Sequence, residues 1–288
     1  MALFEHILFP VDFSDRCLAT KPYVLAMAQR FKSKLTLLHV VQIPVSWYGG
    51  IEVSYPVPLD MTPLRNDAKR KLDLFNDFPD DINVTEIVEE GDPGMMIASF
   101  AEGNGVDLVM IPTHGYGKFR ALLLGSVAAK VLHDASCPVW TSAHAEEPAV
   151  QPHADYRSIL CAVDLSPGSA DLIKRAVEFT SHYDAKLRLV HAIGATEARP
   201  DKYLDTEFRE FLLKSSRDTI MDMQRDLGVN LEVCLDGGAV SNAVHDAAVT
   251  HQADLVIIGR GRVQKSFGRL RTNSYAIIRD CPCPVLSI

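Results

Sequence analysis

A glycine-containing stretch at residues 112–131, PTHGYGKFRALLLGSVAAKV, has the residue types of a phosphate cradle. Gly125 and Ser126 come directly before a helix-like run, and a helix N-terminus offers unpaired N–H groups and a positive dipole end to an anion. Pro112 closes the preceding apolar run, where a phosphate loop more comfortably has glycine. The spacing suggests phosphate binding, although Gly-Ser before a helix is also a common cap.

Asp12 is the second candidate, because it follows an apolar run and ligands of open α/β sheets bind outside the carboxyl ends of the strands. A carboxylate repels phosphate but accepts hydrogen bonds from a ribose or a base. The alternative is that Asp12 and Ser14 only cap the next helix. His39 is explained as a core histidine in an apolar strand, and His114 as a lone loop histidine.

These candidates belong to a pattern that occurs twice in the chain, in the same order and at nearly constant offsets. We therefore predict a first domain at 1–142, a linker at 143–156 and a second domain at 157–288. The paired segments are HILFPVDFSD (6–15) with SILCAVDLSP (158–167), KLTLLHVV (34–41) with KLRLVHAI (186–193), EEGDPGMMIASFAE (89–102) with LDGGAVSNAVHDAA (235–248), VDLVMIP (106–112) with ADLVIIG (253–259), and SCPVWTS (136–142) with PCPVLSI (282–288).

The elements that must position the candidates follow from the periodicity of each half. Short continuous apolar runs alternate with stretches of helical spacing, which indicates strands buried on both faces and joined by right-handed crossovers. The predicted fold class is α/β, with two repeated doubly wound domains that each contain a five-stranded parallel sheet. Segment 43–60 interrupts the pattern and is predicted to be a surface loop over the carboxyl edge. The expected strands are 6–11, 34–41, 84–89, 107–112 and 138–142, then 158–163, 186–192, 230–235, 254–259 and 283–287.

Composition narrows the function classes. The 288 residues are 47% hydrophobic and carry a net charge of -8, without the basic face of a general nucleic-acid binder. No run approaches the ~18 apolar residues of a membrane span, and the N-terminus lacks the basic region of a signal peptide. Six cysteines lie mostly in apolar runs, which favours reduced thiols in a cytoplasmic protein. Cys281 and Cys283 are interpreted as bracketing a turn, with metal binding as the less favoured alternative.

The ordered segments PVDFSD, LHVV, EEGDP, DLVMIPTHG and LLLGSVAAKVLHDASCPVW resemble a universal stress protein domain across residues 4–142. The second half resembles the same family more faintly across 157–288, so the chain is similar to tandem-type universal stress proteins. The resemblance implies an adenine nucleotide alpha hydrolase-like fold and a nucleotide-responsive stress protein that acts through conformation and partners. It also implies that the two domains pair through their fifth strands, while a homodimer of such chains stays open.

The ATP-binding branch of that family has Gly, two residues, Gly, nine residues, Gly, then Ser or Thr. This chain matches with Gly115, Gly125 and Ser126, and departs at Pro112. The proline damages binding if the family glycine is needed for positive φ or for its N–H, and only crowds the ligand if smallness is what matters. The implied ligand is ATP, with ADP or AMP as alternatives and Mg²⁺ as an accompanying ion. The resemblance implies that Asp12 and Val41 face the adenosine, with Gly115, Gly125, Ser126 and Val127 around the ribose and phosphates. Together with the strand ends and the loop entry at the switch point, the predicted contact residues are Pro10, Val11, Asp12, Val41, Ile111, Pro112, His114, Gly115, Gly125, Ser126 and Val127.

The second copy reads GRGRVQKSFGRLRTNS at 259–274. Counting back from the shared Cys-Pro-Val places Arg271 at the Gly125 position and Thr272 at the Ser126 position. The arginine blocks close backbone approach, so the nucleotide is expected in the first domain. The basic residues of 260–271 are interpreted as a solvated loop, with phosphate or an acidic partner as the alternative.

No set of nucleophile, base and orienting group can be assembled from the motifs of the chain. A dedicated enzyme is therefore not expected. Two alternatives to a nucleotide-binding stress protein stay open. One is a tandem scaffold that binds no nucleotide, and the other is a weak ATP hydrolase that uses Asp12, His114 and Ser126.

Overall fold

The computed structural model describes residues 3–42, 60–113, 124–142, 155–193, 206–260 and 272–288. The chain forms two compact units, which we call the first unit (1–111 and 126–137) and the second unit (112–125 and 138–288). The units are defined by contacts and the predicted domains by the repeat, so the bounds 1–142 and 157–288 stay a prediction. Three predictions fall largely outside the described residues: the surface loop (43–59), the linker (143–154) and the basic loop (261–271).

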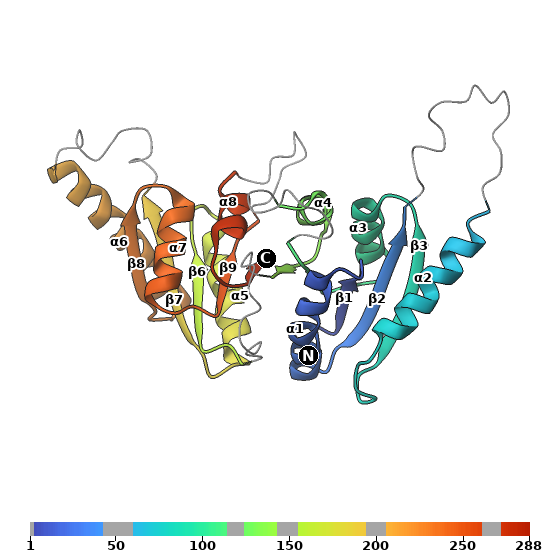
Figure 1. Cartoon of the computed structure of the whole chain (residues 1–288). Helices are drawn as coiled ribbons and strands as arrows, with labels where there is room; N and C mark the ends of the chain where they lie inside the picture. Colours follow the sequence, from blue (N-terminus) through green and yellow to red (C-terminus); the bar gives the residue numbers. More distant parts are fainter. Residues whose placement is uncertain (1–2, 43–59, 114–123, 143–154, 194–205, 261–271) are drawn as a thin grey trace, which may run out of the picture. The chain divides into compact units, whose positions relative to one another are not determined.

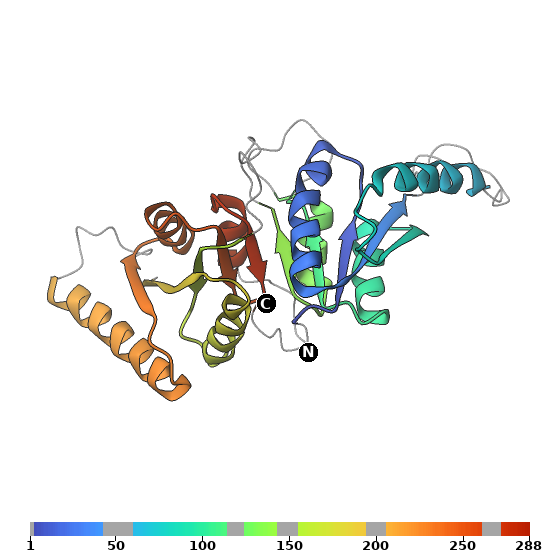
Figure 2. The same ribbon diagram turned by 90° about the horizontal axis from the view of Figure 1, so that it is seen from below.

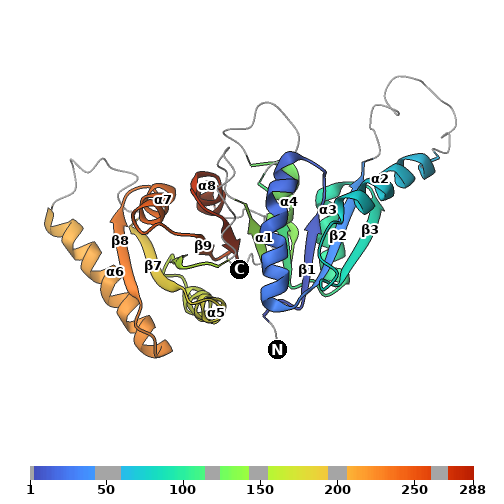
Figure 3. The same ribbon diagram turned by 60° about the horizontal axis from the view of Figure 1, so that its bottom comes forward.

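The first unit holds a parallel sheet in the order β3-β2-β1-β4. Its strands are β1 (His6–Pro10), β2 (Lys34–Val41), β3 (Val84–Glu90) and β4 (Leu108–Ile111). Its helices are α1 (Asp15–Phe31), α2 (Thr62–Phe75), α3 (Pro93–Gly103) and α4 (Ser126–Asp134). Helices α3 and α4 lie side by side on the face of the sheet opposite α1 and α2 (Figures 1 and 3), as right-handed crossovers require when the strand order reverses.

The second unit repeats this arrangement and adds two strands, β10 and β5, in the order β5-β10-β9-β6-β7-β8. Its strands are β5 (Val139–Thr141), β6 (Ser158–Ala162), β7 (Lys186–Ile193), β8 (Glu232–Gly237), β9 (Leu255–Ile258) and β10 (Val285–Ser287). Its helices are α5 (Ser169–Ser181), α6 (Thr206–Leu227), α7 (Val240–Thr250) and α8 (Thr272–Asp280). In Figure 2, α7 and α8 cover one face of the sheet, and α5 and α6 cover the other.

Strand β5 pairs with β10 in antiparallel register, with Trp140 opposite Leu286. This is the pairing of the fifth strands of the two repeats that the family resemblance implied. Trp140 is fully buried, and its indole Nε1 donates a hydrogen bond of 3.0 Å to the hydroxyl of Tyr156. A large buried aromatic side chain with its polar atom satisfied makes this ladder a part of the core of the second unit.

The predicted strands are confirmed as elements in both repeats. Central strands such as β1 and β4 are buried along their whole length, which explains their uninterrupted apolar sequences. The outer strands β3 and β8 are only half-buried, and they contain charged as well as apolar residues. The largest shift is in β8, which covers Glu232–Gly237 where the sequence predicted 230–235.

Candidate functional site

Asp12 lies at the carboxyl end of β1 and is half-buried. The hydrogen bonding to β2 extends one residue past β1, because the N–H of Val11 donates to the carbonyl of Leu38 at 2.8 Å. One carboxylate oxygen of Asp12, Oδ1, accepts hydrogen bonds from the backbone N–H and hydroxyl of Ser14 at 3.0 and 2.6 Å. Ser14 in turn caps α1, because its hydroxyl accepts from the N–H of Cys17. Within the described residues no hydrogen bond reaches Oδ2, which stays available to a ligand hydroxyl.

The turn after Asp12 has a backbone conformation that the sequence does not predict. Phe13 has φ 61°, and its counterpart Leu165 in the second unit has φ 57°. Left-handed backbone at bulky residues costs roughly 1–2 kcal/mol, and such strain gathers at functional sites. The strained turn folds the Asp12 side chain back to Ser14, and Asp164 makes the equivalent bond to the N–H of Ser166 at 3.0 Å.

Strand β4 lies next to β1, whereas the chain leaves β1 towards β2 on its other side. The strand order therefore reverses between β1 and β4, which is the switch point where ligands of open α/β sheets bind. Asp12 follows β1, and Ile111 is the last residue of β4. The first unit thus brings the predicted carboxylate and the predicted loop entry to the same edge of the sheet, on neighbouring strands.

The predicted apolar residues lie beneath this edge. Val11, Val41 and Ile111 are 3%, 8% and 5% exposed, and Pro10 is buried as well. The carbonyl of Val41 accepts a hydrogen bond from the N–H of Gly91, which ties the end of β2 to the turn before α3. These residues belong to the core beneath this edge of the sheet and offer little exposed contact area.

Helix α4 begins at Ser126, as the cradle requires. Ser126 is exposed and Val127 half-buried, and the N–H groups of a first helical turn have no acceptor within the helix. The N–H of Gly125 is already used, because it donates to the carbonyl of Thr113 at 2.8 Å. An anion at this end would therefore meet Ser126 and Val127 rather than the Gly125 N–H. His114 and Gly115 lie outside the described residues.

Pro112 is buried, and the corresponding residue of the second repeat shows which backbone conformation this position requires. Gly259, the residue that replaces it there, does not have positive φ. A Cβ added to Gly259 would meet Leu172 Cδ2 at 3.4 Å, an ordinary contact. Left-handed backbone is therefore not what this position demands in the second repeat, which leaves the lost N–H and the bulk of the ring as the effects of Pro112.

His39 has the core role that its apolar strand suggested. Its Nδ1 lies 2.7 Å from the carbonyl oxygen of Val11, and His191 makes the same contact with Val163 at 2.8 Å. The His39 ring also lies 4.7 Å from that of Phe13, measured between centroids. Both histidines thus brace the strand end that carries the carboxylate.

Lys130 and Asp92 are two further residues near the helix starts, and the sequence did not single them out for the site. Asp92 caps α3 by accepting from the N–H of Met95, and its Oδ1 lies 3.5 Å from Lys130 Nζ on α4. The hydrogen bond from Met95 and the Lys130 charge hold the pKa of Asp92 below its usual range. Asp92 precedes Pro93-Gly94, a helix-start signal that was readable, whereas the partner on α4 required the fold.

In the second unit, α8 begins at Thr272 and is nine residues long, as α4 is. This agrees with the alignment of Thr272 to Ser126. Asp164 is exposed at the end of β6. The described residues hold no group of three or more histidine, cysteine or acidic side chains that could bind a metal ion. Among the same residues, no helix is long and apolar enough to span a membrane.

Fold and site together define a doubly wound α/β domain present twice, with a carboxylate and a helix start at the switch point of each copy. The family model of the universal stress protein family matches residues 3–142 and again 155–288. The chain belongs to the universal stress protein family, as a tandem form with two copies of its domain.

Individual relatives agree with this assignment. Universal stress protein MJ0531 of Methanocaldococcus jannaschii is 30% identical over 140 residues, which cover 48% of this chain and 81% of the relative. Universal stress protein MJ0577 of the same organism is 27% identical over 151 residues, which cover 48% of this chain and 93% of the relative. The match to a crystal structure of a universal stress protein from Archaeoglobus fulgidus covers 99% of this chain and 96% of the chain in that structure. The TM-score is 0.70 and the sequence identity is 20%. That last likeness concerns the fold alone.

Proposed function

We propose that this universal stress protein binds an adenine nucleotide, ATP in the first place with ADP or AMP as alternatives, at the switch point of the first unit. The observation that carries the proposal is the placement of Asp12 at the end of β1, next to β4, together with the start of α4 at Ser126. A carboxylate for the ribose and a helix N-terminus for the phosphates are the two groups that a nucleotide needs.

Each residue has a distinct role in this proposal. Asp12 accepts a ribose hydroxyl through Oδ2, since Oδ1 is held by Ser14. Val41 and Ile111 support the adenosine from below. Ser126 and Val127 donate N–H groups to phosphate, with the Ser126 hydroxyl as a further donor. His114 and Gly115 complete the loop around the phosphates, and Mg²⁺ accompanies the nucleotide through phosphate oxygens.

The first unit is the better site because the second repeat lacks the small residue before its helix. Arg271 occupies the sequence position of Gly125, and a side chain there opposes close approach of an anion to the backbone. One nucleotide per chain is therefore the proposed stoichiometry. The protein then acts in the stress response through nucleotide-dependent conformation and partners, in the cytoplasm, and without a dedicated catalytic set.

A scaffold that binds no nucleotide is the second candidate, and Pro112 is the observation that favours it. The ring fills space at the entrance of the loop and removes one N–H. Pro112→Gly separates the two candidates. It tightens an affinity that the unaltered protein already has if the site works but is crowded, and it creates binding that the unaltered protein lacks if the proline has abolished the site.

The proposal is tested by the thermal midpoint of the full-length protein with and without ATP–Mg. A ligand at 100 times its Kd stabilises the native state by about 2.7 kcal/mol. Asp12→Asn and Asp164→Asn are matched variants, because both aspartates bond to the serine two residues later. We expect Asp12→Asn to reduce the ATP-induced shift and Asp164→Asn to preserve it. No shift at millimolar ATP in the unaltered protein would overturn the proposal.

A further inference from the structure

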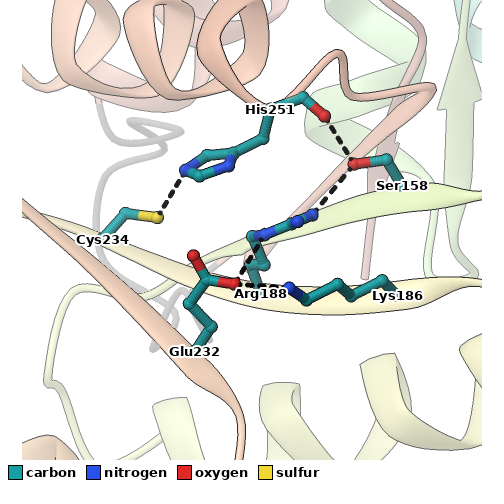
Figure 4. A network of polar contacts seen from close by, with 6 residues as sticks. All are labelled: Ser158, Lys186, Arg188, Glu232, Cys234 and His251. Atoms are coloured by element: carbon teal, nitrogen blue, oxygen red, sulfur yellow. Dashed lines mark hydrogen bonds and ion pairs between the residues drawn. The ribbon is translucent and has the colours of Figure 1, made fainter.

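A cysteine–histidine pair lies in the second unit near the amino ends of its strands, at the edge opposite the strand ends described above. Sγ of Cys234, on β8, lies 3.2 Å from Nε2 of His251, the residue that follows α7. Figure 4 shows the imidazole ring of His251 turned towards the sulfur. A thiol and an imidazole at hydrogen-bond distance form a nucleophile and its base.

Cys234 also differs from the other cysteines in exposure. All six cysteines lie in described residues, and Cys234 is half-buried whereas the other five are buried. Burial raises the pKa of Cys17 and of Cys161 to about 12, so these thiols stay protonated and shielded. Cys234 is therefore the thiol that reagents in solution reach first.

The surroundings of Cys234 keep its thiol protonated at rest, so that its reaction needs a base. Burial first, and then Glu232, raise the pKa of Cys234, while Arg188 and Lys186 oppose the shift. The thiol accordingly rests protonated, and Nε2 of His251 is the ring atom within reach of its proton. His251 is also the residue that caps the C-terminus of α7, at the negative end of the helix dipole.

A network of polar contacts holds the base in place (Figure 4). The carbonyl of His251 accepts from the hydroxyl of Ser158 at 2.8 Å, and Arg188 Nη1 lies 3.2 Å from the same hydroxyl oxygen. Glu232 Oε2 accepts from Arg188 Nε at 3.0 Å and lies 2.7 Å from Lys186 Nζ. The network fixes the backbone of His251 and leaves its Nε2 facing the sulfur.

The first unit shows that the fold does not require this pair. Cys234 pairs with Val190 in β7, and the equivalent strand pair in the first unit places Ile87 opposite Leu38. The residue that caps the C-terminus of α3, as His251 caps α7, is Asn104. The same two positions therefore carry isoleucine and asparagine in one repeat and a nucleophile with its base in the other.

We propose that Cys234 and His251 form a modification site that reacts with small hydroperoxides. The sulfur attacks one oxygen of hydrogen peroxide, so that an S–O bond forms as the O–O bond breaks. The thiol proton passes to His251 Nε2 and then to the departing hydroxide, which leaves as water. Cys234 is oxidised to a sulfenic acid and the peroxide is reduced to water. A half-buried thiol suits a small uncharged oxidant of this kind.

The experiment exposes the full-length protein to hydrogen peroxide, traps sulfenic acid with dimedone, and measures labelling of each cysteine by peptide mass spectrometry. We expect Cys234 to be labelled at least about tenfold faster than any other cysteine, in keeping with its exposure and base. His251→Asn copies Asn104 and should slow labelling of Cys234 about tenfold. His133→Asn, an exposed histidine change in the first unit, should leave the rate unchanged.

Two results would overturn the proposal. One is labelling of Cys234 no faster than that of the buried cysteines, and the other is a rate within twofold of normal in folded His251→Asn. If His251→Asn does not fold, the unaltered protein provides the test through its rate of alkylation by iodoacetamide against pH. A thiol that a base assists reacts at a rate that levels off below about pH 8.5, the ordinary pKa of a free thiol. A rate at Cys234 that rises steadily up to pH 9 would show that His251 does not assist.

Discussion

Replacing Gly94 by alanine tests whether close packing of α3 against α4 sets the position of the helix start at Ser126. Gly94 is buried in the first turn of α3. A Cβ added there would lie 2.8 Å from Cβ and 2.7 Å from Cδ of Lys130 on α4. Lys130 Cδ can move away, but its Cβ is fixed to the backbone of α4. Relief to an ordinary carbon contact therefore requires the helices to separate by about 0.7 Å.

Two opposing effects determine the magnitude of the change in stability. Alanine is favoured over glycine within a helix by up to about 1 kcal/mol. Overpacking a tight contact costs typically about 1–3 kcal/mol. Since Cβ of Lys130 cannot rotate away, we expect the packing cost to win and Gly94→Ala to destabilise the protein by about 1–2 kcal/mol.

Urea unfolding of the full-length protein measures this prediction, with Gly103→Ala as the matched control. Gly103 ends the same helix, and a Cβ there meets nothing within 4 Å. Gly103→Ala should be neutral or slightly stabilising. In double-mutant cycles with Gly94→Ala, Lys130→Gly, which removes the fixed Cβ, should show a larger favourable coupling energy than Lys130→Ala, which keeps it. Gly94→Ala with the stability of the unaltered protein would refute the reasoning.

Three further predictions concern other parts of the chain. Burial lowers the pKa of His6 from its ordinary 6.5, so the unfolded chain takes up a proton before the folded chain does as the pH falls below 6.5. The free energy of unfolding should then fall towards pH 5 by at most about 1.4 kcal/mol per pH unit. His6→Ser should flatten this slope in urea titrations. Lys32 caps α1 with φ 53° and is exposed, so Lys32→Gly should raise the free energy of unfolding by about 0.5–1 kcal/mol, and a lower midpoint would contradict this. Tyr156→Phe removes the hydrogen bond between its hydroxyl and Nε1 of the buried Trp140 and should lower the free energy of unfolding in urea by about 0.5–1.5 kcal/mol, and an unchanged value would contradict this.

The sequence was sufficient for the fold because each repeat alternates buried strands with amphipathic helices in an order that physical rules restrict strongly. The continuous apolar run before Asp12 and the second copy before Asp164 located corresponding strands independently. The β5–β10 register added detail that no local pattern contains, because pairing between distant short strands depends on tertiary packing.

The candidate site was predictable in its types of residue and less so in its geometry. Asp12 and Ser126 follow from strand ends and helix starts. The left-handed turn at Phe13 did not, since phenylalanine normally avoids that conformation. The Cys234–His251 pair could likewise not be predicted from the sequence, because residues on β8 and after α7 become neighbours only when α7 packs against the sheet.

Calorimetric titration of ATP–Mg into the unaltered protein and into Gly125→Arg tests the central claim most directly. The variant places at the start of α4 the residue that the second repeat has at the corresponding position. Our account predicts one nucleotide per chain in the unaltered protein and loss of that binding in folded Gly125→Arg. No binding to the unaltered protein, or equal binding by both, would contradict a nucleotide site at the start of α4.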